Sequence, residues 1–239
     1  MRLRYTAGMD TAPQRRLIQS YGRRRGRPLR SGRAALIQDL LPALAIPPPA
    51  AGEVLDPRRL FVRPMDAVWL EVGFGAGEHL AAQAEAHRST GFIGAETYIN
   101  GIAGLLARVR EVRLDNLRLW PADIRLLLPA FPPRSIARAF VLFPDPWPKA
   151  RHHKRRLVAA PFLDELGRVM APGAELRVAT DDEDYAAWVR EQLAAHHGFV
   201  PVPGAHPRRR PADWIPTRYE MKALEQGRTP HYFCVVCAP

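Results

Sequence analysis

The chain of 239 residues is long enough for one α/β domain with a short extension and too short for two large domains. Hydrophobic residues make up 47% and charged residues 25%, which predicts a packed core, and no apolar run approaches the roughly 20 residues needed to cross a bilayer. Lysine and arginine outnumber aspartate and glutamate by 35 to 24, a formal net charge of +11, so a polyanionic partner such as nucleic acid or an anionic membrane surface is favoured.

The N-terminal segment is basic. Arg15–Arg33 is dense in arginine and glycine with little apolar periodicity, so we expect an extended or loosely ordered arm. A short helix is expected at Leu36–Ile46, ended by the prolines that follow. Residues 1–50 are therefore interpreted as an arm with a short helix, and residues 51–239 as the main domain.

From Val68 onward, apolar runs alternate with stretches of helical periodicity, which indicates βαβ units and a parallel sheet covered on both faces. A loop rich in proline and arginine, Pro201–Pro216, ends this alternation. The predicted strands are Ala67–Val72, Gly91–Ala95, Leu117–Trp120, Ile136–Phe143, Glu175–Ala179 and His231–Cys237; the predicted helices are Glu78–His87, Ile99–Val112, Arg156–Met170, Asp184–His196 and Arg218–Glu225.

The first predicted strand runs into three alternate glycines, Gly73, Gly75 and Gly77, and a helix follows. A dinucleotide loop has the spacing G-x-G-x-x-G and holds a pyrophosphate, whereas this loop is G-x-G-x-G, which disfavours a dehydrogenase. Glu71 and Glu78 beside it would repel a pyrophosphate and suit a cationic ligand with an amino group. The pattern resembles motif I of class I methyltransferases, in which this loop lies close to S-adenosylmethionine; a tight turn with no ligand is the alternative.

Two further acids follow later strands. Glu96 ends the second strand, where an acid can accept both ribose hydroxyls of a nucleoside, and Asp123 follows the third, near the expected place of an adenine. Either acid alone could be a helix N-cap or a solvated loop residue. Because the carboxyl ends of parallel strands share one edge, we expect both acids to lie with Glu71 at a ligand site.

The segment F-P-D-P-W-P-K follows the fourth strand and contains Asp145 and Trp147. Its three prolines restrict the conformations of both residues. A basic run extends from Lys149 to Arg156 behind it, and we expect that run to open the next helix and to meet phosphates. His152 and His153 are expected to contact phosphate or solvent, and no metal site is expected.

Taken together, these segments resemble the bacterial tRNA (guanine-N7-)-methyltransferases, and the likeness covers nearly the whole chain. The matching segments are Tyr21–Arg27, the glycine loop, Gly94–Tyr98, Asn116–Asp123, Phe143–Lys149 with H-x-K-R-R behind it, Ala179–Asp181 with Tyr185, and Thr217–Glu220. The resemblance implies a Rossmann-like fold of the class I methyltransferases, with a mostly parallel seven-stranded sheet and an antiparallel C-terminal strand. Tyr219 stands where the family more often has Phe.

The resemblance also implies roles for individual residues. The implied cofactor ligands are Glu71, Gly73, Gly75, Gly77, Glu96, Asp123 and Asp145, and Asp145 is also the implied active-site residue. The implied substrate-binding residues are Lys149, Arg151, Lys154, Arg155, Asp181, Thr217, Arg218, Tyr219 and Glu220. Asp181 could equally cap the helix that runs through Trp188, and Asp181 and Glu220 are expected to accept hydrogen bonds from guanine N1–H and the exocyclic amine.

The implied reaction is methylation of guanine N7 in tRNA, at position 46 of the variable loop, with S-adenosylmethionine as donor. N7 carries a free lone pair, so no catalytic base is required, and Asp145 is expected to orient the purine and stabilise the positive charge that arrives on it. Arg23–Arg27 and Arg208–Arg210 are expected to bind the tRNA backbone. The alternatives are an exocyclic-amine nucleic-acid methyltransferase and a non-catalytic RNA-binding module.

We expect a cytoplasmic monomer that needs no protein partner and no membrane. The first twenty residues contain arginines without an apolar stretch behind them, which argues against a secretory signal although a transit peptide stays open. The only cysteines, Cys234 and Cys237, lie in an apolar run and are interpreted as buried strand residues.

Overall fold

A computed structural model describes residues 21–239, so the part of the predicted arm before Tyr21 lies outside the described residues. These residues form a seven-stranded sheet in the order β3-β2-β1-β4-β5-β7-β6. Strands β1 to β5 pair in parallel, and β7 is antiparallel to both β5 and β6. The predicted fold class is therefore confirmed. The strands are β1 (Ala67–Val72), β2 (Thr90–Ala95), β3 (Leu117–Trp120), β4 (Ile136–Leu142), β5 (Met170–Thr180), β6 (Phe199–Pro201) and β7 (His231–Cys237).

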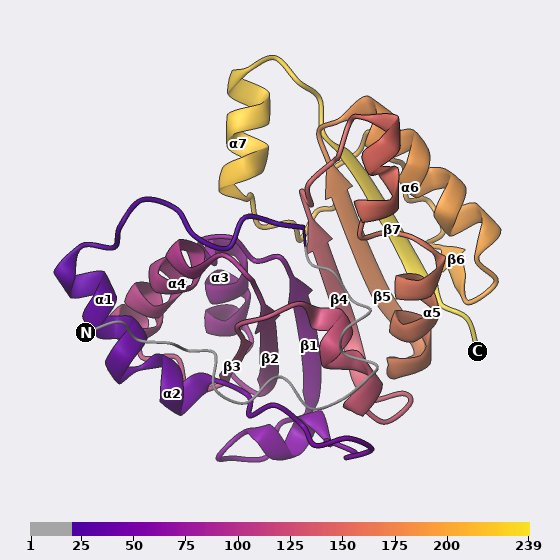
Figure 1. The fold of residues 1–239 in the computed structure, drawn as a ribbon. Coiled ribbons are helices and arrows are strands. Elements are labelled where there is room, and N and C mark those ends of the chain that lie inside the picture. The colour runs from indigo at the N-terminus through magenta and orange to yellow at the C-terminus, as the bar shows by residue number, and fades with distance from the viewer. Residues whose placement is uncertain (1–20) are drawn as a thin grey trace.

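Helices cover both faces of this sheet (Figure 1). The α-helices are α1 (Ser31–Asp39), α2 (Leu41–Leu44), α3 (Glu78–Ala86), α4 (Ile99–Val112), α5 (Ala160–Val169), α6 (Glu183–Ala195) and α7 (Arg218–Glu225). Short 3-10 turns are η2 (Pro57–Leu60), η3 (Ile124–Leu126), η4 (Leu128–Ala130) and η5 (Ala150–Arg155). No helix among residues 21–239 is long and apolar enough to cross a membrane.

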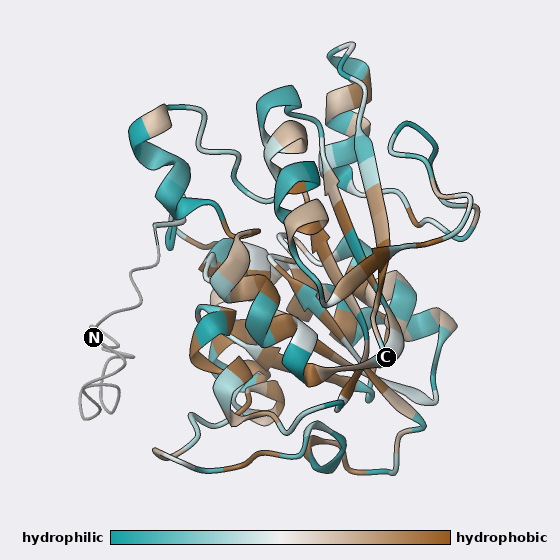
Figure 2. Ribbon diagram, turned by 90° about the vertical axis from the view of Figure 1, so that its right-hand side faces the viewer, coloured by the Kyte–Doolittle hydropathy of each residue, from teal (hydrophilic) through white to brown (hydrophobic). Residues whose placement is uncertain are grey.

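The core has two main layers because alternate residues of a strand point to opposite faces of the sheet. Val68, Leu70 and Val72 of β1 belong to the layer under α5 and α6, whereas the layer under α3 and α4 is built on Phe92, Leu117 and Leu119. Figure 2 shows the resulting concentration of hydrophobic residues along the strands. A third, smaller cluster continues the second layer towards β4, β5 and β7, where Trp214 of the loop before α7 covers the sheet.

Several predicted boundaries were wrong. The single helix expected at Leu36–Ile46 is two helices, α1 and α2, because Pro42 has no N–H with which to continue the helical hydrogen bonds. The basic run at residues 150–155 forms the 3-10 turn η5 and does not open the next helix, which starts at Ala160. Strand β6 was missed because a three-residue strand at the sheet edge leaves no periodic signal.

The parallel strands end in register. Val72 of β1 pairs with Ala95 of β2, Ala95 pairs with Trp120 of β3, and Leu142 of β4 pairs with Ala179 of β5. The loops that follow these strands therefore meet at one edge of the sheet, which is where ligands bind in open sheets of this kind. In Figure 1 the described part of the arm, Tyr21–Arg30, crosses this same edge beside α4.

Candidate active site

The glycine loop after β1 has the conformation that its sequence predicted. Gly73, Gly75 and Gly77 have φ values of 73°, 58° and 76°, in the left-handed region that other residues rarely adopt. A Cβ on Gly73 would meet no atom within 4 Å, so this part of the loop faces open space. At Gly75, in contrast, a Cβ would stand 3.0 Å from Cε2 of Tyr219. The loop thus leaves room on one side and has the Tyr219 ring on the other.

Glu96 joins this loop to the start of α4. Its Oε2 accepts a hydrogen bond from the Gly75 amide at 2.8 Å, and its Oε1 accepts from the amides of Thr97 and Tyr98 at 2.7 and 2.8 Å. Two carboxylate oxygens offer about four acceptor positions, so one position is left, on Oε2. The prediction that Glu96 accepts hydrogen bonds from both ribose hydroxyls stays a prediction. Burial raises the pKa of Glu96, and the nearby charge of Asp145 adds to the shift.

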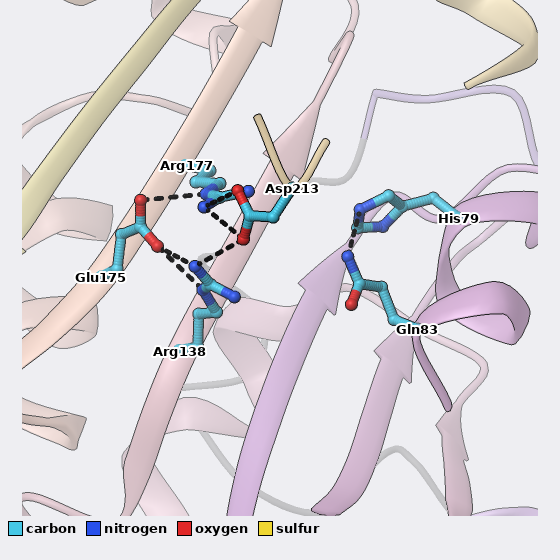
Figure 3. A network of polar contacts seen from close by, with 6 residues as sticks. All are labelled: His79, Gln83, Arg138, Glu175, Arg177 and Asp213. Carbon is cyan, nitrogen blue, oxygen red and sulfur yellow. Dashed lines mark hydrogen bonds and ion pairs between the residues drawn. The ribbon is translucent and has the colours of Figure 1, made fainter. Parts of the chain in front are cut away.

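Glu71 lies buried at the end of β1, beside a histidine that sequence analysis did not single out. Nδ1 of His79 lies 2.7 Å from Oε2 of Glu71, and Nε2 of His79 lies 3.3 Å from Nε2 of Gln83 (Figure 3 shows the second contact). An amide nitrogen can only donate, so with this placement Nε2 of His79 accepts and Nδ1 carries the proton. His79 then donates to Glu71 and fixes the orientation of its carboxylate.

Asp123 is held by its neighbour Arg125 at the end of β3. Its Oδ1 accepts from the amide and from Nε of Arg125, both at 3.0 Å, and its Oδ2 accepts from Nη2 at 2.7 Å. The carboxylate also caps the turn η3. Asp123 is thus both at the expected sheet edge and in the N-cap role that the sequence left open.

The proline-rich loop after β4 is strained at both ends. Phe143 and Trp147 have φ values of 52° and 49°, although each is bulky and each precedes a proline, which disfavours helical backbone in the residue before it. Strain of this kind persists only where surrounding contacts hold it, and it clusters at functional sites. One such contact comes from Arg156, which is buried and donates from Nε to the Pro146 carbonyl at 2.9 Å.

Arg156 is a site residue that sequence analysis misassigned to phosphate binding. Its guanidinium lies 5.3 Å from the ring centroid of Tyr185 and 5.2 Å from that of Trp188, and it forms an ion pair with Asp184. It is therefore a support that ties the proline-rich loop to α6. The local sequence gives no signal of this role, because the aromatic partners of Arg156 lie far along the chain, on α6.

Asp145, between the strained residues, faces the same space as Glu96. The two carboxylates are close enough for the charge of Asp145 to act on Glu96, and a Cβ on Gly22 of the arm would stand 4.0 Å from Oδ2 of Asp145. Its side chain keeps contact with solvent, yet desolvation by the surrounding protein raises the pKa of Asp145. Two neighbouring carboxylates with raised pKa values form a site suited to a cation.

The arm is attached to this site by specific contacts. The Ile99 amide donates to the Arg24 carbonyl at 3.1 Å, and the Gly26 amide donates to Oδ1 of Asn100 at 2.9 Å. Farther along, the Arg155 guanidinium lies 4.5 Å from the ring centroid of Tyr21 and 4.9 Å from that of Trp147. Arg155 thus lies between two aromatic rings and joins the arm to the proline-rich loop.

The other predicted RNA-binding cations differ in solvent exposure and in whether they form ion pairs within the protein. Lys149, Arg151 and Lys154 are exposed around η5, as are Arg23, Arg24, Arg25 and Arg27 on the arm. In the other predicted cluster, Arg208 forms an ion pair with Glu183 at 2.9 Å. Residues 21–239 contain no group of three or more histidine, cysteine, aspartate or glutamate side chains arranged to hold a metal.

Asp181 does not cap α6. The N-cap is Asp182, whose Oδ1 accepts from the Tyr185 amide at 2.8 Å. Asp181 instead pairs with Nη2 of Arg228 at 3.0 Å, near the carboxyl end of β5. The alternative prediction, that Asp181 caps this helix, is therefore wrong, and Asp182 has that role. Helical periodicity does not locate the end of a helix to within one residue, so it could not distinguish the two aspartates.

The segment Thr217–Glu220 forms the first turn of α7. Thr217 and Glu220 make a reciprocal capping box. Arg218 is exposed, and Tyr219 is 51% exposed with its ring against the glycine loop. Glu220, in contrast, is 0% exposed, so its carboxylate lies in the interior of the protein.

Comparison with known proteins identifies the family of the chain. A family model described as "Putative methyltransferase" matches residues 65–233. Among curated proteins, the chain is 50% identical to a tRNA (guanine-N(7)-)-methyltransferase of Rhodospirillum rubrum, covering 89% of this chain and 85% of the relative, and 46% identical to one of Roseobacter denitrificans, covering 95% and 98%.

Solved structures share the fold at low sequence identity. The 16S rRNA methyltransferase KamB has a TM-score of 0.52 at 18% identity, over 73% of this chain and 89% of that one. TrmN from Thermus thermophilus has a TM-score of 0.51 at 14% identity, over 86% and 48%. These likenesses show the fold of the class I methyltransferases, and the identity to the curated relatives makes the chain a member of the tRNA (guanine-N(7)-)-methyltransferase family.

Proposed function

We propose that this protein transfers a methyl group from S-adenosylmethionine to N7 of a guanine in tRNA. The observation that carries the proposal is the meeting of Glu96 and Asp145 beside the left-handed glycine loop, under the Tyr219 ring and next to a strained proline-rich loop. The tRNA (guanine-N(7)-)-methyltransferases to which the chain is nearly half identical support the choice of base and of RNA.

The residues present fit S-adenosylmethionine, which when bound supplies a methyl group on a positively charged sulfur. The open space beside Gly73 lets a ligand approach the backbone, and Oε2 of Glu96 keeps one acceptor position for a ribose hydroxyl. Glu71, oriented by His79, is available for a ligand amino group. Since the pKa values of Glu96 and Asp145 are raised by desolvation, a bound cation would stabilise their charged forms.

For the guanine, the chain supplies position and charge and no base. N7 has an exposed lone pair, so nothing must be deprotonated before the methyl group is transferred. Asp145 would hold the purine edge and favour the positive charge that the purine acquires. The rigid frame around it, built by the strained loop and Arg156, would keep the attacking nitrogen aligned, and alignment of this kind can lower a barrier by roughly 7–11 kcal/mol.

The exposed cations would bind the tRNA backbone. The arm and η5 present Arg23, Arg24, Arg25, Arg27, Lys149, Arg151 and Lys154 on the side of the sheet edge where Asp145 lies. Phosphate contacts set the register of the RNA without reading its sequence. We propose position 46 of the variable loop as the target, and a cytoplasmic enzyme that works as a monomer, from the resemblance of the chain to its family.

The test is incubation with labelled cofactor and unmodified tRNA, followed by mapping of the methylated nucleotide. N7-methylguanosine makes the strand cleavable by borohydride and aniline, whereas an exocyclic methyl group does not. Cleavage at one guanosine supports the proposal. Label in RNA without cleavage indicates an exocyclic-amine methyltransferase, and binding of tRNA without any uptake of label indicates the non-catalytic RNA-binding module.

A further inference from the structure

Trp214 is a buried tryptophan in a loop without regular secondary structure. The loop lies between β6 and α7, and the Trp214 side chain packs with Phe140 of β4 and Tyr232 of β7 in the small third cluster of the core. Its ring centroid lies 5.0 Å from that of Tyr232. A buried indole needs an acceptor for its N–H group, so the neighbours of Nε1 indicate what the residue does.

The acceptor of this N–H group is Glu220, in the first turn of α7. Nε1 of Trp214 donates to Oε2 of Glu220 at 2.7 Å. The same carboxylate accepts from the Thr217 amide at 3.3 Å and from the Tyr232 hydroxyl at 2.6 Å. Three hydrogen bonds leave about one of four acceptor positions open, on Oε1. Trp214 therefore orients a carboxylate that can still accept a hydrogen bond from guanine, which is the role that the sequence predicts for Glu220.

Trp214 also contacts the histidine that orients Glu71. The ring centroids of Trp214 and His79 are 6.2 Å apart, within the range of about 4.5–7 Å over which aromatic rings interact. His79 packs edge-on against Phe140 at 4.8 Å between centroids, and its Nδ1 lies 2.7 Å from Oε2 of Glu71. Protein interiors are closely packed, so a shift of the indole would move the imidazole and with it the Glu71 carboxylate.

The position of Trp214 over the sheet is fixed by its neighbour Asp213. The Asp213 carboxylate accepts two hydrogen bonds from Nη2 of Arg177 on β5, at 2.7 and 2.9 Å (Figure 3). Arg177 is buried, and Arg138 of β4 forms ion pairs with both Asp213 and Glu175. Displacing Asp213 would leave a buried charge without its partner, which is costly. The loop therefore holds the indole in one place between the two carboxylates that it influences.

We propose that Trp214 is a positioning residue shared by the two halves of the methyl-transfer site. It orients Glu220 on the guanine side through its N–H group, and it supports Glu71 on the cofactor side through His79. The inference rests on the proposed function for the identity of the two ligands, and it assigns no contact between Trp214 and either of them. Two consequences follow: binding of the cofactor is felt at Trp214, and loss of the indole N–H group is felt at the guanine.

The first consequence is tested by NMR of the indole N–H groups in the full chain, which contains five tryptophans. Trp214→Phe identifies the Trp214 signal. We expect Glu220→Gln to shift this signal, because a charged acceptor binds the N–H group more strongly than a neutral one. Saturating S-adenosylhomocysteine should also shift it in the wild-type protein. In His79→Phe, which keeps a ring beside Trp214 and removes the donor to Glu71, the shift caused by the cofactor should disappear.

The outcomes of this experiment separate the inference from the proposed function. If the cofactor binds and the Trp214 signal stays in place, or shifts equally in His79→Phe, the link through His79 is wrong while the proposed function stands. If the cofactor does not bind to the wild-type protein, the proposed function fails and the inference fails with it.

The second consequence is tested by kinetics and cofactor binding. Trp214→Phe keeps a ring and removes the N–H group, so kcat/KM for tRNA should fall about tenfold or more while the Kd of S-adenosylhomocysteine stays within twofold. Trp214→Leu also removes the ring, and this Kd should then rise about threefold or more. Trp69→Phe, the same change on β1, is the matched control and should leave both values within twofold.

A double variant shows whether the N–H group acts through Glu220. The loss of kcat/KM in Trp214→Phe/Glu220→Gln should be smaller than the product of the two single losses. The proposal is overturned if Trp214→Phe leaves kcat/KM unchanged, if the two losses multiply, or if Trp214→Leu leaves the cofactor affinity unchanged. Should Trp214→Leu fail to fold, the comparison of the wild-type protein with His79→Phe by NMR decides the cofactor side.

Discussion

Replacing Glu96 by glutamine tests the cofactor site most directly. The carboxylate already accepts three backbone amides, from Gly75, Thr97 and Tyr98, and has one acceptor position left. Glutamine has a single acceptor oxygen, and its NH2 group would face N–H donors. The ribose hydroxyl therefore loses its charged partner. A hydrogen bond to a charged group contributes about 1.5–3 kcal/mol, which corresponds to a Kd for the cofactor about 10- to 150-fold higher.

The effect of Glu96→Gln on folding should be smaller than its effect on binding. An unsatisfied buried amide costs about 1–3 kcal/mol, but burial raises the pKa of Glu96, so the neutral side chain also removes a desolvation cost in the folded state. These two contributions oppose each other, and we expect Tm to change by no more than about 4–8 °C, since 1 kcal/mol shifts Tm by about 2–4 °C in a chain of this size.

The assay is isothermal titration calorimetry at neutral pH with S-adenosylhomocysteine, with Glu85→Gln on the exposed side of α3 as a control for the loss of one negative charge. In addition, of two analogues that lack the 2′ or the 3′ hydroxyl, one should bind the wild-type protein more weakly than the other, and this difference should disappear in Glu96→Gln. A Kd within twofold of wild type in Glu96→Gln, or equal losses for both analogues in both proteins, would refute the assignment of this acceptor position.

The other predictions concern charge, pH, salt and the arm. Asp145→Asn should lower kcat by about 10²–10³-fold while tRNA affinity stays within twofold, and equal losses in both would contradict its role. Because the pKa values of Asp145 and Glu96 are raised above their usual values, the negative charges that attract a cationic cofactor are lost as the pH falls through those raised values. Cofactor affinity measured from pH 7 to pH 4 should therefore fall, and the fall should flatten in the double variant Asp145→Asn/Glu96→Gln. The affinity for tRNA should decrease steeply with added salt, and Arg151→Ala should reduce the slope of log K against log[salt] by about 0.7–0.9. An affinity that does not change with salt would contradict binding of the RNA backbone by these cations. Gly26→Ala should loosen the arm, since its Cβ would collide with the Tyr98 hydroxyl and stand 3.1 Å from Oδ1 of Asn100; faster limited proteolysis within Tyr21–Arg27 checks this, and an unchanged rate would show that the Tyr98 side chain moves aside.

Much of the ligand edge could be predicted from local sequence. The alternation of apolar runs with helical stretches located β1 to β4. The glycines of the strand-to-helix turn indicated a tight backbone, and the structure gives them positive φ values, as at Gly73. Once the strands were known to be parallel, their carboxyl ends had to share an edge, and this placed Glu96 and Asp145 together. Such inferences succeed because they depend on residues only a few positions apart and on one rule of topology.

Partners of buried polar groups, in contrast, were decided by the tertiary structure. Nothing near Glu220 in the sequence shows that Tyr232 and Trp214 donate to it, and nothing near Arg156 shows that it supports Pro146 from a position between two aromatic rings. A carboxylate or guanidinium on the surface and one in the interior have the same local pattern. Whether such a group contacts solvent, substrate or another side chain depends on segments that come together only when the sheet and its covering loops have formed. Once buried, a polar group must find its hydrogen-bond partners within the protein.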